Sequence, residues 1–454
     1  MYVCGTTPYD HCHLGHARCY VVFDVIRKYL EYKGYEVTYV QNFTDVDDKI
    51  IKRAQELGSK VEDVAEEYIS EYFEVMGRLN IREANSYPKT TEHIGEMIQL
   101  VEKLIKRGYA YVVDGDVYFE VDKFGSYGKL SHRSREEMRA GARIEVDKRK
   151  KNPLDFALWK SSKPGEPFWE SPWGRGRPGW HIECSAMSME HLGASFDIHG
   201  GGQDLIFPHH ENEMAQSEAA TGKPFVRYWI HNGFVTVNRE KMSKSLGNFF
   251  TVREIYEKYS PDVVRLFLVS QYYRSPMDFS DDKLEEARKS LERFRNALDN
   301  IEFLLKGLKA GEKTSLPRKE DTNLSEAKKK FVTAMDDDFN TARALGYMFD
   351  LVGKANKAIS GRSPDLTFLL GAERALRSMG SLLGFLKEKA GEKVGIDEFQ
   401  IEKRIEERNA ARGKKDWGKA DKIRRDLEKI GVILEDTPFG TRWKYRTIKG
   451  SPKK

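Results

Sequence analysis

Two short motifs, far apart in the sequence, hold the residue types that binding a triphosphate requires. His13-Leu14-Gly15-His16 follows an apolar start at residues 1–5, and Lys241-Met242-Ser243-Lys244-Ser245 lies far downstream. Attack on the α-phosphate of ATP builds negative charge on its oxygens and on the departing pyrophosphate, and preorganised cations and N–H donors stabilise this charge. His13 and His16 can act from one side, and Lys241 and Lys244 from a mobile loop. Together the motifs predict an enzyme that uses ATP and releases pyrophosphate.

A second group of residues has metal-binding chemistry. His209 and Glu213 are four residues apart, so on a helix they share one face. Cys4 ends the first expected strand, and Cys184 lies in the returning half of the sheet. Two thiolates, an imidazole and a carboxylate suit tetrahedral zinc. The spacing is too wide to be a metal motif in itself, so two ordinary buried cysteines and a surface His–Glu pair are the alternative.

Other candidate residues have both a structural and a functional interpretation. Cys12 and Cys19 lie near the first motif and could compete as ligands, but a structural role is favoured. The basic run Lys148–Lys151 can touch nucleic acid, although a solvated turn is the favoured interpretation. Trp180 fits a pocket and the core equally well.

The composition indicates a soluble globular protein of several domains. The chain has 454 residues, of which 32% are charged and 39% hydrophobic, and this length suggests roughly three domains. No apolar run approaches the roughly 20 residues that span a membrane, and no secretory signal is visible at the N-terminus. Four cysteines in so long a chain form no disulfide framework, which predicts a reducing, cytoplasmic setting.

The charge is distributed unevenly along the chain. Residues 401–454 hold 17 Lys/Arg and 9 Asp/Glu, while the whole chain has a net charge of only +5. A basic C-terminal module on a slightly acidic body suggests that a polyanion docks at this end. A solvated helix face is the alternative interpretation.

The N-terminal residues alternate between strand and helix patterns. Residues 1–5 are typical of a buried strand, residues 13–34 of a loop followed by a helix, and residues 35–40 of a second strand. Thr44 is predicted to be the N-cap of the next helix, with aspartates in its first turn. This order predicts a parallel α/β sheet. The first histidine motif then lies at the start of a helix, where free backbone N–H groups favour phosphate binding.

The rest of the chain divides into further regions. Residues 87–177 change pattern and are predicted to be an insertion into a Rossmann-like catalytic domain, which comprises residues 1–86 and 178–260. Nearly all of the remaining chain is predicted to be helical, with helices at 282–306, 323–359 and 366–388. After residue 260 the chain is expected to divide into three regions: residues 261–306, a helical bundle at 307–394, and a small basic α/β module at 395–454. This module is predicted to contain a helix at 396–430 and a strand at 432–434.

The motifs together resemble those of the cysteinyl-tRNA synthetases, a family of class I aminoacyl-tRNA synthetases. The resemblance extends over nearly the whole chain and its motifs are highly specific in combination. It is carried by Met1–Arg18, Gln41–Ile51, Gly179–Met187, Phe196–Ser217, His231–Asn248 and Leu434–Trp443.

The resemblance implies a role for each site residue. It implies one zinc ion per chain, and that His13, His16, Lys241 and Lys244 serve the phosphates of ATP, which binds with Mg²⁺. It implies that residues 261–306 contact the stem of the tRNA. The implied zinc ligands are Cys4, Cys184, His209 and Glu213; the implied amino-acid pocket residues are Gly5, Thr44, Trp180 and His209; the implied ATP-binding residues are Gly15, Gly201, Gly202, Asp204 and Lys244; and the implied tRNA contacts are Arg412, Asp421, Asp436 and Trp443.

The implied reaction joins cysteine to tRNA(Cys) through a cysteinyl-adenylate, and the resemblance suggests a monomer. A pocket without a metal separates near-isosteres such as cysteine and serine by roughly 10–200-fold. A metal that binds the substrate thiolate discriminates on softness instead, so no editing domain is expected.

Two departures and two alternatives accompany this interpretation. The family usually carries a further segment before the first strand, which suggests a misassigned start or a trimmed version, and it commonly has Asn where this chain has His16. Ligases that join cysteine to an amino-sugar share the zinc and ATP residues but lack an anticodon module, against which residues 395–454 argue. A non-catalytic RNA-binding paralogue need not keep both ATP motifs and all four ligands.

Overall fold

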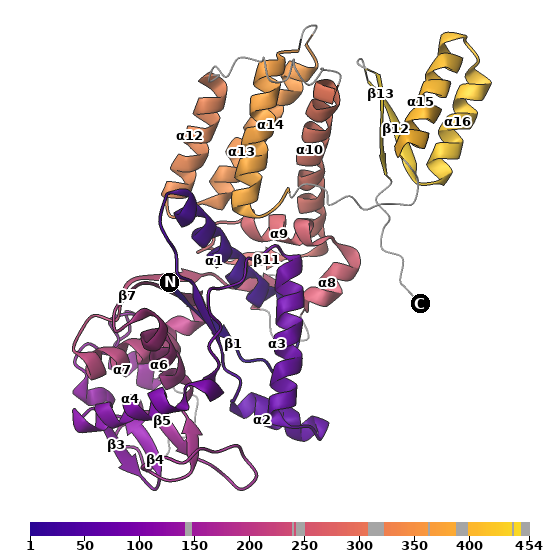
Figure 1. Cartoon of the computed structure of the whole chain (residues 1–454). Helices are drawn as coiled ribbons and strands as arrows, with labels where there is room; N and C mark the ends of the chain where they lie inside the picture. Colours follow the sequence, from indigo (N-terminus) through magenta and orange to yellow (C-terminus); the bar gives the residue numbers. More distant parts are fainter. Residues whose placement is uncertain are drawn as a thin grey trace.

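The structure is a computed structural model of the 454-residue chain. It describes residues 1–140, 148–237, 240–241, 250–306, 322–361, 364–386, 398–437 and 440–445. Among the helices so described, none is both long and apolar enough to cross a bilayer. Figure 1 shows a parallel sheet in the middle of the molecule, with an inserted sheet on one side and a helical bundle on the other.

The central sheet is parallel throughout, with strand order β2-β1-β7-β8. Its strands are β1 (Tyr2–Thr6), β2 (Val40–Phe43), β7 (Phe196–Gly202) and β8 (Val226–Asn232), and the helices of this region are α1 (Leu14–Tyr32), α2 (Asp48–Leu57), α3 (Val61–Arg78), α6 (Trp180–Leu192) and α7 (Glu211–Thr221). β1 lies between two strands and is buried along most of its length, which explains its continuous apolar sequence. The predicted α/β class is confirmed.

Two local predictions in this sheet are wrong. The strand predicted at 35–40 lies later in the chain, since β2 begins at Val40, which pairs with Tyr2 of β1. Tyr35 and its neighbours are exposed. Thr44 is not the N-cap of α2. Asp47 is the cap, and its carboxylate accepts a hydrogen bond from Lys49 N at 3.0 Å, which satisfies an amide at the helix start.

The inserted region forms an antiparallel sheet of order β3-β4-β5-β6. Its elements are η1 (Thr90–Glu92), α4 (Ile94–Lys106), β3 (Ala110–Val113), β4 (Asp116–Phe119), η2 (Val121–Lys123), α5 (Arg135–Ala140), β5 (Phe156–Ser161) and β6 (Gly176–Pro178). Its side chains do not form a separate core. Met97, Phe119 and Trp159 belong to the same buried cluster as Tyr2 and Cys4 of β1.

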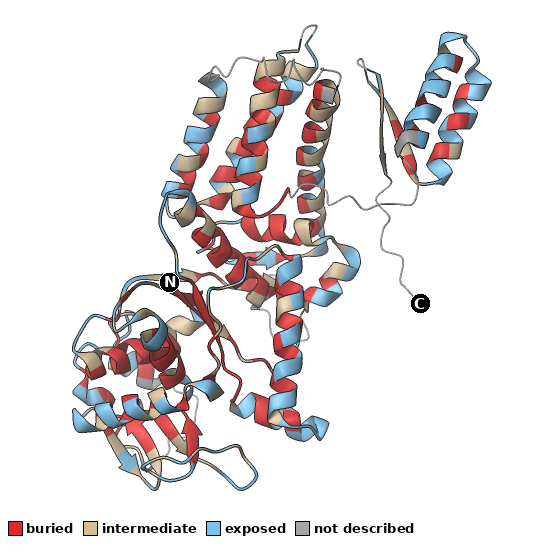
Figure 2. Ribbon diagram, in the orientation of Figure 1, coloured by how far each residue is buried: buried red, intermediate tan, exposed pale blue. Residues whose placement is uncertain are grey.

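The C-terminal half is largely helical. It contains β9 (Val235–Val237), β10 (Glu240–Lys241), α8 (Val252–Lys258), α9 (Pro261–Val269), β11 (Met277–Phe279), α10 (Asp281–Lys306), α12 (Thr322–Asp336), α13 (Thr341–Ile359), α14 (Leu366–Leu383), α15 (Glu398–Gly413), α16 (Trp417–Lys429), β12 (Val432–Thr437) and β13 (Gly440–Tyr445). Figure 2 shows buried residues on the facing sides of α10, α12, α13 and α14. The helix predicted at 323–359 is two helices, because Asp338 and Phe339 have positive φ.

The basic C-terminal module has its own hydrophobic cluster, which α15, α16 and the β12–β13 hairpin share. The single helix predicted at 396–430 is divided into α15 and α16 at Lys415, whose φ is 59°. Figure 1 shows this module to one side of the bundle. Residues 307–321, between the helices predicted at 282–306 and 323–359, lie outside the described residues.

Candidate active site

Four side chains with metal-ligand chemistry meet at the C-terminal side of the central sheet. Cys4 lies in β1, Cys184 in α6, His209 in the turn before α7, and Glu213 in the first turn of α7. All four are buried, and one ligand atom from each lies within 4.8 Å of the other three. The two Sγ atoms are 3.7 Å apart, and His209 Nε2 lies 3.0 Å from Glu213 Oε1. The structure therefore brings together the residues that the sequence suggested.

The donor set fits a cation. Burial raises the pKa of the Cys4 thiol well above its usual value, with further contributions from Cys184 and Glu213. The ionised forms of these three groups would repel one another away from water, so a bound cation is what allows them to carry charge together. Burial also lowers the pKa of His209 well below its usual value, which keeps its imidazole neutral and able to bind a metal.

Further histidines surround this cluster. His199 Nε2 lies 2.8 Å from Glu213 Oε2, which leaves Oε1 directed at the cluster. His181 Nδ1 lies 2.9 Å from His209 Nδ1, a contact that orients a ligand ring in the way outer partners commonly do. His210 Nε2 lies 3.3 Å from Cys4 Sγ. His199 and His210 also form a second possible ligand set with Cys4 and Glu213.

Sequence reasoning missed His210 and His199. His210 is three residues from Glu213, a spacing as suitable for a shared helix face as the four residues that singled out His209. The pair His209-His210 was therefore a usable signal. Which ring faces which ligand depends on the irregular turn at Ile206–His210, and no sequence pattern specifies that turn.

The residues suggested for the amino-acid pocket lie beside the candidate metal cluster. The Trp180 ring lies 4.2 Å from the His209 ring, and Trp180 is 38% exposed, so it is not part of the core. Thr44 is buried nearby and accepts a hydrogen bond from Asn42 Nδ2 at 3.4 Å. Gly5 N donates to Asn42 Oδ1 at 2.8 Å, and a Cβ at Gly5 would lie 1.5 Å from Asn42 O. Only glycine fits at this position.

The first histidine motif caps α1. His13 is the N-cap, and its Nδ1 accepts hydrogen bonds from Gly15 N at 3.0 Å and His16 N at 3.3 Å. The His13 and His16 rings stack with centroids 3.6 Å apart. Burial lowers the pKa of His13 to about 4 and holds that of His16 well below its usual value. The imidazoles are therefore neutral N–H donors at pH 7, not the cations that the sequence also allowed.

The glycine segment of β7 ends beside this motif, because β7 and β1 are neighbouring parallel strands. A Cβ at Gly201 would lie 2.8 Å from Leu205 Cδ1, and one at Gly202 would lie 2.5 Å from Asp204 Oδ1. Both atoms are the ends of side chains that can move aside, so neither contact by itself requires glycine. Asp204 is exposed at this end of the sheet, and its charge contributes to the raised pKa of Cys19.

The lysine motif is described only at its start. Lys241 is the last residue of β10, and its backbone pairs with Thr236 of β9. Lys244 and the rest of residues 242–249 lie outside the described residues. β9 also pairs with β11, so the strand that leads to the motif is held on both sides.

Comparison with known proteins decides the family. Residues 1–289 match the model for the catalytic domain of class I (C) tRNA synthetases, residues 330–387 that of the DALR domain, and residues 401–446 that of the cysteinyl-tRNA ligase anticodon binding domain. A cysteine–tRNA ligase from Geobacter sulfurreducens is 54% identical over 98% of this chain and 95% of its own length. The chain belongs to the cysteine–tRNA ligase family.

Further comparisons agree with this family. The Carboxydothermus hydrogenoformans cysteine–tRNA ligase is 55% identical, again over 98% of this chain and 95% of its own length. The Mycobacterium tuberculosis methionyl-tRNA synthetase in complex with methionyl-adenylate has the same fold. Its TM-score is 0.63 at 17% identity, and the match covers 84% of this chain and 91% of that structure.

The C-terminal residues suggested as tRNA contacts lie in the module that matches this family's anticodon binding domain. The Asp436 carboxylate is bonded by Arg408 at 2.8 Å through both guanidinium Nη atoms and by Arg412 Nη1 at 2.9 Å. The Arg408 bonds hold the pKa of Asp436 well below its usual range. Trp443 packs against the small core of the module, and Asp421 is exposed.

The remaining candidates take part in contacts within the chain. Cys12 and Cys19 are buried in the large hydrophobic core, away from the metal cluster. In the basic run, Arg149 Nη2 lies 2.8 Å from Asp116 Oδ2, and Lys151 Nζ lies 3.0 Å from Glu120 Oε2. These ion pairs reduce the charge that the run presents to a polyanion.

Proposed function

We propose that this protein charges tRNA(Cys) with cysteine. In the first step a carboxylate oxygen of cysteine attacks the α-phosphorus of ATP, the bond to the β-phosphate oxygen breaks, and pyrophosphate leaves. In the second step the 2′-hydroxyl of the terminal adenosine attacks the carbonyl carbon, and AMP leaves with the bonding pair. The observation that carries the proposal is the buried cluster of Cys4, Cys184, His209 and Glu213 beside the helix that begins at His13.

The donor set favours zinc as the metal, because two thiolates and an imidazole suit a borderline-soft ion in tetrahedral geometry. Cys4, Cys184, His209 and Glu213 would hold the zinc, which would supply a soft ligand site that favours the substrate thiolate over a hydroxyl. The chain's own residues shape the rest of the pocket. Gly5 allows β1 to lie against the Asn42 backbone beside the pocket, Trp180 and Thr44 line its sides, and His181 orients His209.

The expected ATP-binding residues contact different parts of the nucleotide. Gly201, Gly202 and Asp204 hold the adenosine at the end of β7. Neutral His13 and His16 donate N–H groups to the phosphates at the start of α1, where the helix dipole favours negative charge. Lys241 and Lys244 provide positive charge, with Mg²⁺ on the pyrophosphate oxygens.

The tRNA extends over the later domains in this proposal. The expected boundaries are 1–86 with 178–260 for catalysis, 87–177 for the insertion, 261–306 for stem contacts, 307–394 for the tRNA-binding bundle, and 395–454 for the anticodon. The reading residues are Arg412, Asp421, Asp436 and Trp443. The protein acts as a monomer.

Charging of bulk tRNA with labelled cysteine and ATP tests this proposal, with serine as the matched control. Cysteine-specific label on tRNA, in product that acid precipitates, is the expected result. Pyrophosphate exchange with cysteine but no labelled tRNA would overturn the tRNA part of the proposal and favour a ligase that uses a small amine. Equal charging with serine would overturn the metal-based selection.

A further inference from the structure

The turn between α12 and α13 holds an unusual backbone conformation. Asp338 and Phe339 have φ values of 52° and 54°, in the left-handed region that is strained for a bulky residue. Such strain persists where surrounding contacts hold it. The Asp338 carboxylate is held in this way by three consecutive residues of a distant segment. Tyr273 Oη donates to Oδ1 at 2.9 Å and Arg274 Nη2 at 3.0 Å, while Tyr272 Oη and Arg274 Nε bond to Oδ2.

The segment that holds Asp338 is bonded on its other side to α1. Arg18 lies in the second turn of α1, just after the first histidine motif, and its side chain is fully buried. Its Nη2 donates to Tyr273 O at 3.2 Å and also to Ser275 O. Arg18 is therefore a direct link between the helix that begins at the histidine motif and the segment 272–275.

The same segment also contacts the chain that leads to the lysine motif. Arg18 Nη1 donates to Phe234 O at 2.7 Å, and Gly233 N donates to Tyr273 O at 2.8 Å. A Cβ at Gly233 would lie 2.6 Å from Ser275 O, so the two backbones lie in tight contact. Residues 233–234 lead directly into β9, on which the Lys241 strand pairs.

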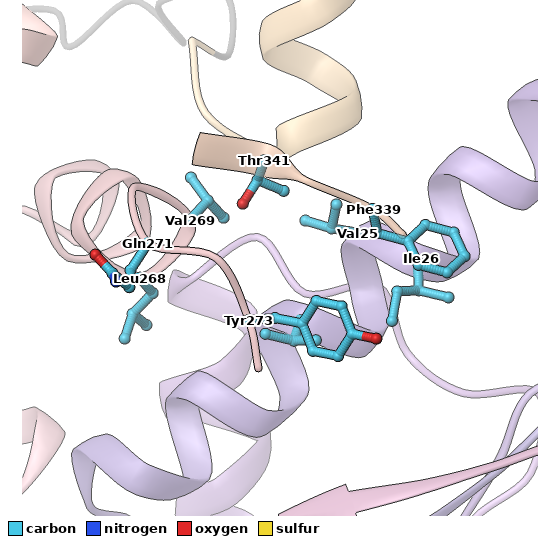
Figure 3. Close-up of a pocket in the computed structure, with 9 residues that line it drawn as sticks. Val25, Ile26, Leu268, Val269, Gln271, Tyr273, Phe339 and Thr341 are labelled. Atoms are coloured by element: carbon cyan, nitrogen blue, oxygen red, sulfur yellow. The ribbon is translucent and has the colours of Figure 1, made fainter. Parts of the chain in front are cut away.

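The turn also contacts α1 near its C-terminal end. Tyr29 Oη donates to Asp336 Oδ1 at 2.7 Å. Figure 3 shows Phe339 beside Val25 and Ile26 of α1, with Tyr273 below them, around a small apolar cavity. The turn is thus attached to α1 at one end directly and at the other through residues 272–275 and Arg18.

We propose that Asp338 is a positioning residue for the ATP site. Its carboxylate fixes Arg274 and the two tyrosines; the segment 272–275 then fixes Arg18 and residues 233–234, which set the positions of the histidine motif and of the Lys241 strand. Asp338 belongs to the helical bundle, so displacement of the bundle by bound tRNA reaches the histidine motif and the Lys241 strand by this route. The inference rests on the proposed function, in which the bundle binds tRNA.

The test is Asp338→Asn in the full-length protein, which keeps the side-chain size but removes the charge that the Arg274 fork needs. Cysteine-dependent pyrophosphate exchange is measured with KM for ATP and for cysteine determined separately, per active site counted from the adenylate burst. We expect KM for ATP to rise by roughly tenfold, the equivalent of one strong charged contact, while KM for cysteine stays unchanged. The cysteine pocket is built on other residues, which this variant leaves in place.

Asp337→Asn is the matched control, because Asp337 lies in the same turn but its carboxylate pairs, within the described part of the chain, with Arg343 inside the bundle at 3.4 Å. We expect it to behave like the unmodified protein. Arg274→Lys loses the two-pronged contact and should raise KM for ATP as Asp338→Asn does, with no further loss in the double variant. This second variant serves if Asp338→Asn does not fold.

Three outcomes would overturn the inference. Equal KM values for ATP in Asp338→Asn and Asp337→Asn would show that the contacts of the Asp338 carboxylate have no effect on the ATP site. A parallel change in both KM values would indicate a general structural defect. Absence of cysteine-dependent exchange in the unmodified protein would instead refute the proposed function, and the inference would fall with it.

Discussion

Three side chains that ionise to anions, Cys4, Cys184 and Glu213, share one buried site with neutral imidazoles. The types of residue were readable from the sequence, and the i,i+4 spacing joined His209 to Glu213. The meeting of Cys4 with Cys184 was not readable from spacing, because it depends on how β1 and α6 pack across the sheet. The family resemblance, not periodicity, supplied that part of the prediction.

Cys184→Ser should remove the metal and cysteine activation together, because a hydroxyl is a poor ligand for a soft ion. We expect metal content to fall to background and exchange to fall by more than about 100-fold, beyond the loss that an outer partner usually produces. Atomic emission and cysteine-dependent exchange measure the two effects. Cys19→Ser is the control, since Cys19 is also buried but lies outside the cluster. Normal exchange in metal-free Cys184→Ser would refute the metal assignment.

The half-buried His13 should make the protein sensitive to acid. Its pKa is about 4 in the folded protein and about 6.5 when unfolded, so the unfolded state binds more protons between these values. The stabilising contribution is present above pH 6.5 and is lost as the pH falls toward 4. It amounts to at most about 3 kcal/mol, and less because the ring is partly open to solvent.

The measurement is the thermal midpoint at pH 7 and pH 4.5 for the unmodified protein and His13→Asn. Asparagine keeps the N-cap acceptor but does not titrate. The variant should lose less stability over this interval than the unmodified protein does. Identical losses would contradict a half-buried, neutral His13.

At the scale of elements, strands and helices with one clear pattern were predicted well, while their ends were not. β1 and α1 were evident from apolar sequence and helical spacing. The strand expected at 35–40 instead begins at Val40, because its register follows β1 and not its own alternation. The helices at 323–359 and 396–430 were predicted as unbroken, since Asp338 and Lys415 hold positive φ in spite of being non-glycine residues.

Asp47→Ala should loosen the start of α2. Loss of an aspartate N-cap costs about 1 kcal/mol, so amide hydrogen exchange in the first turn of α2 should become roughly fivefold faster. Thr44→Val is the control, because Thr44 does not cap this helix. Faster amide exchange in Thr44→Val together with an unchanged rate in Asp47→Ala would support the original prediction that Thr44 is the N-cap.

At the scale of the whole molecule, the sequence indicates how charge is distributed among the regions but not which regions share a hydrophobic core. The basic residues concentrate in the C-terminal module, as the sequence indicated, and this module has its own small core. The change of pattern that the sequence shows at residues 87–177 coincides with the antiparallel strands β3 to β6. The sharing of a core between this region and the catalytic strands was not predictable, because that core joins side chains distant in sequence, such as Met97 and Tyr2.

A chain that ends before α15 should keep cysteine-dependent exchange and lose tRNA charging. Each lost base contact is worth about 1–3 kcal/mol, so kcat/KM for tRNA should fall by about 100-fold or more. Exchange and charging are measured on the same preparation, and the full-length chain is the control. Loss of both activities would show that the module also supports the catalytic domain.

The core that Cys4 and Cys184 share with Met97, Phe119 and Trp159 has a consequence for the history of this chain. Part of the wall behind the candidate metal site is supplied by residues that lie between β2 and β7 in the sequence. A descendant that shed its C-terminal module would lose a recognition surface and little else. Loss of the inserted region in a descendant would expose the candidate metal site to water. This part of the gene should therefore tolerate deletions less well than the part that encodes the C-terminal module.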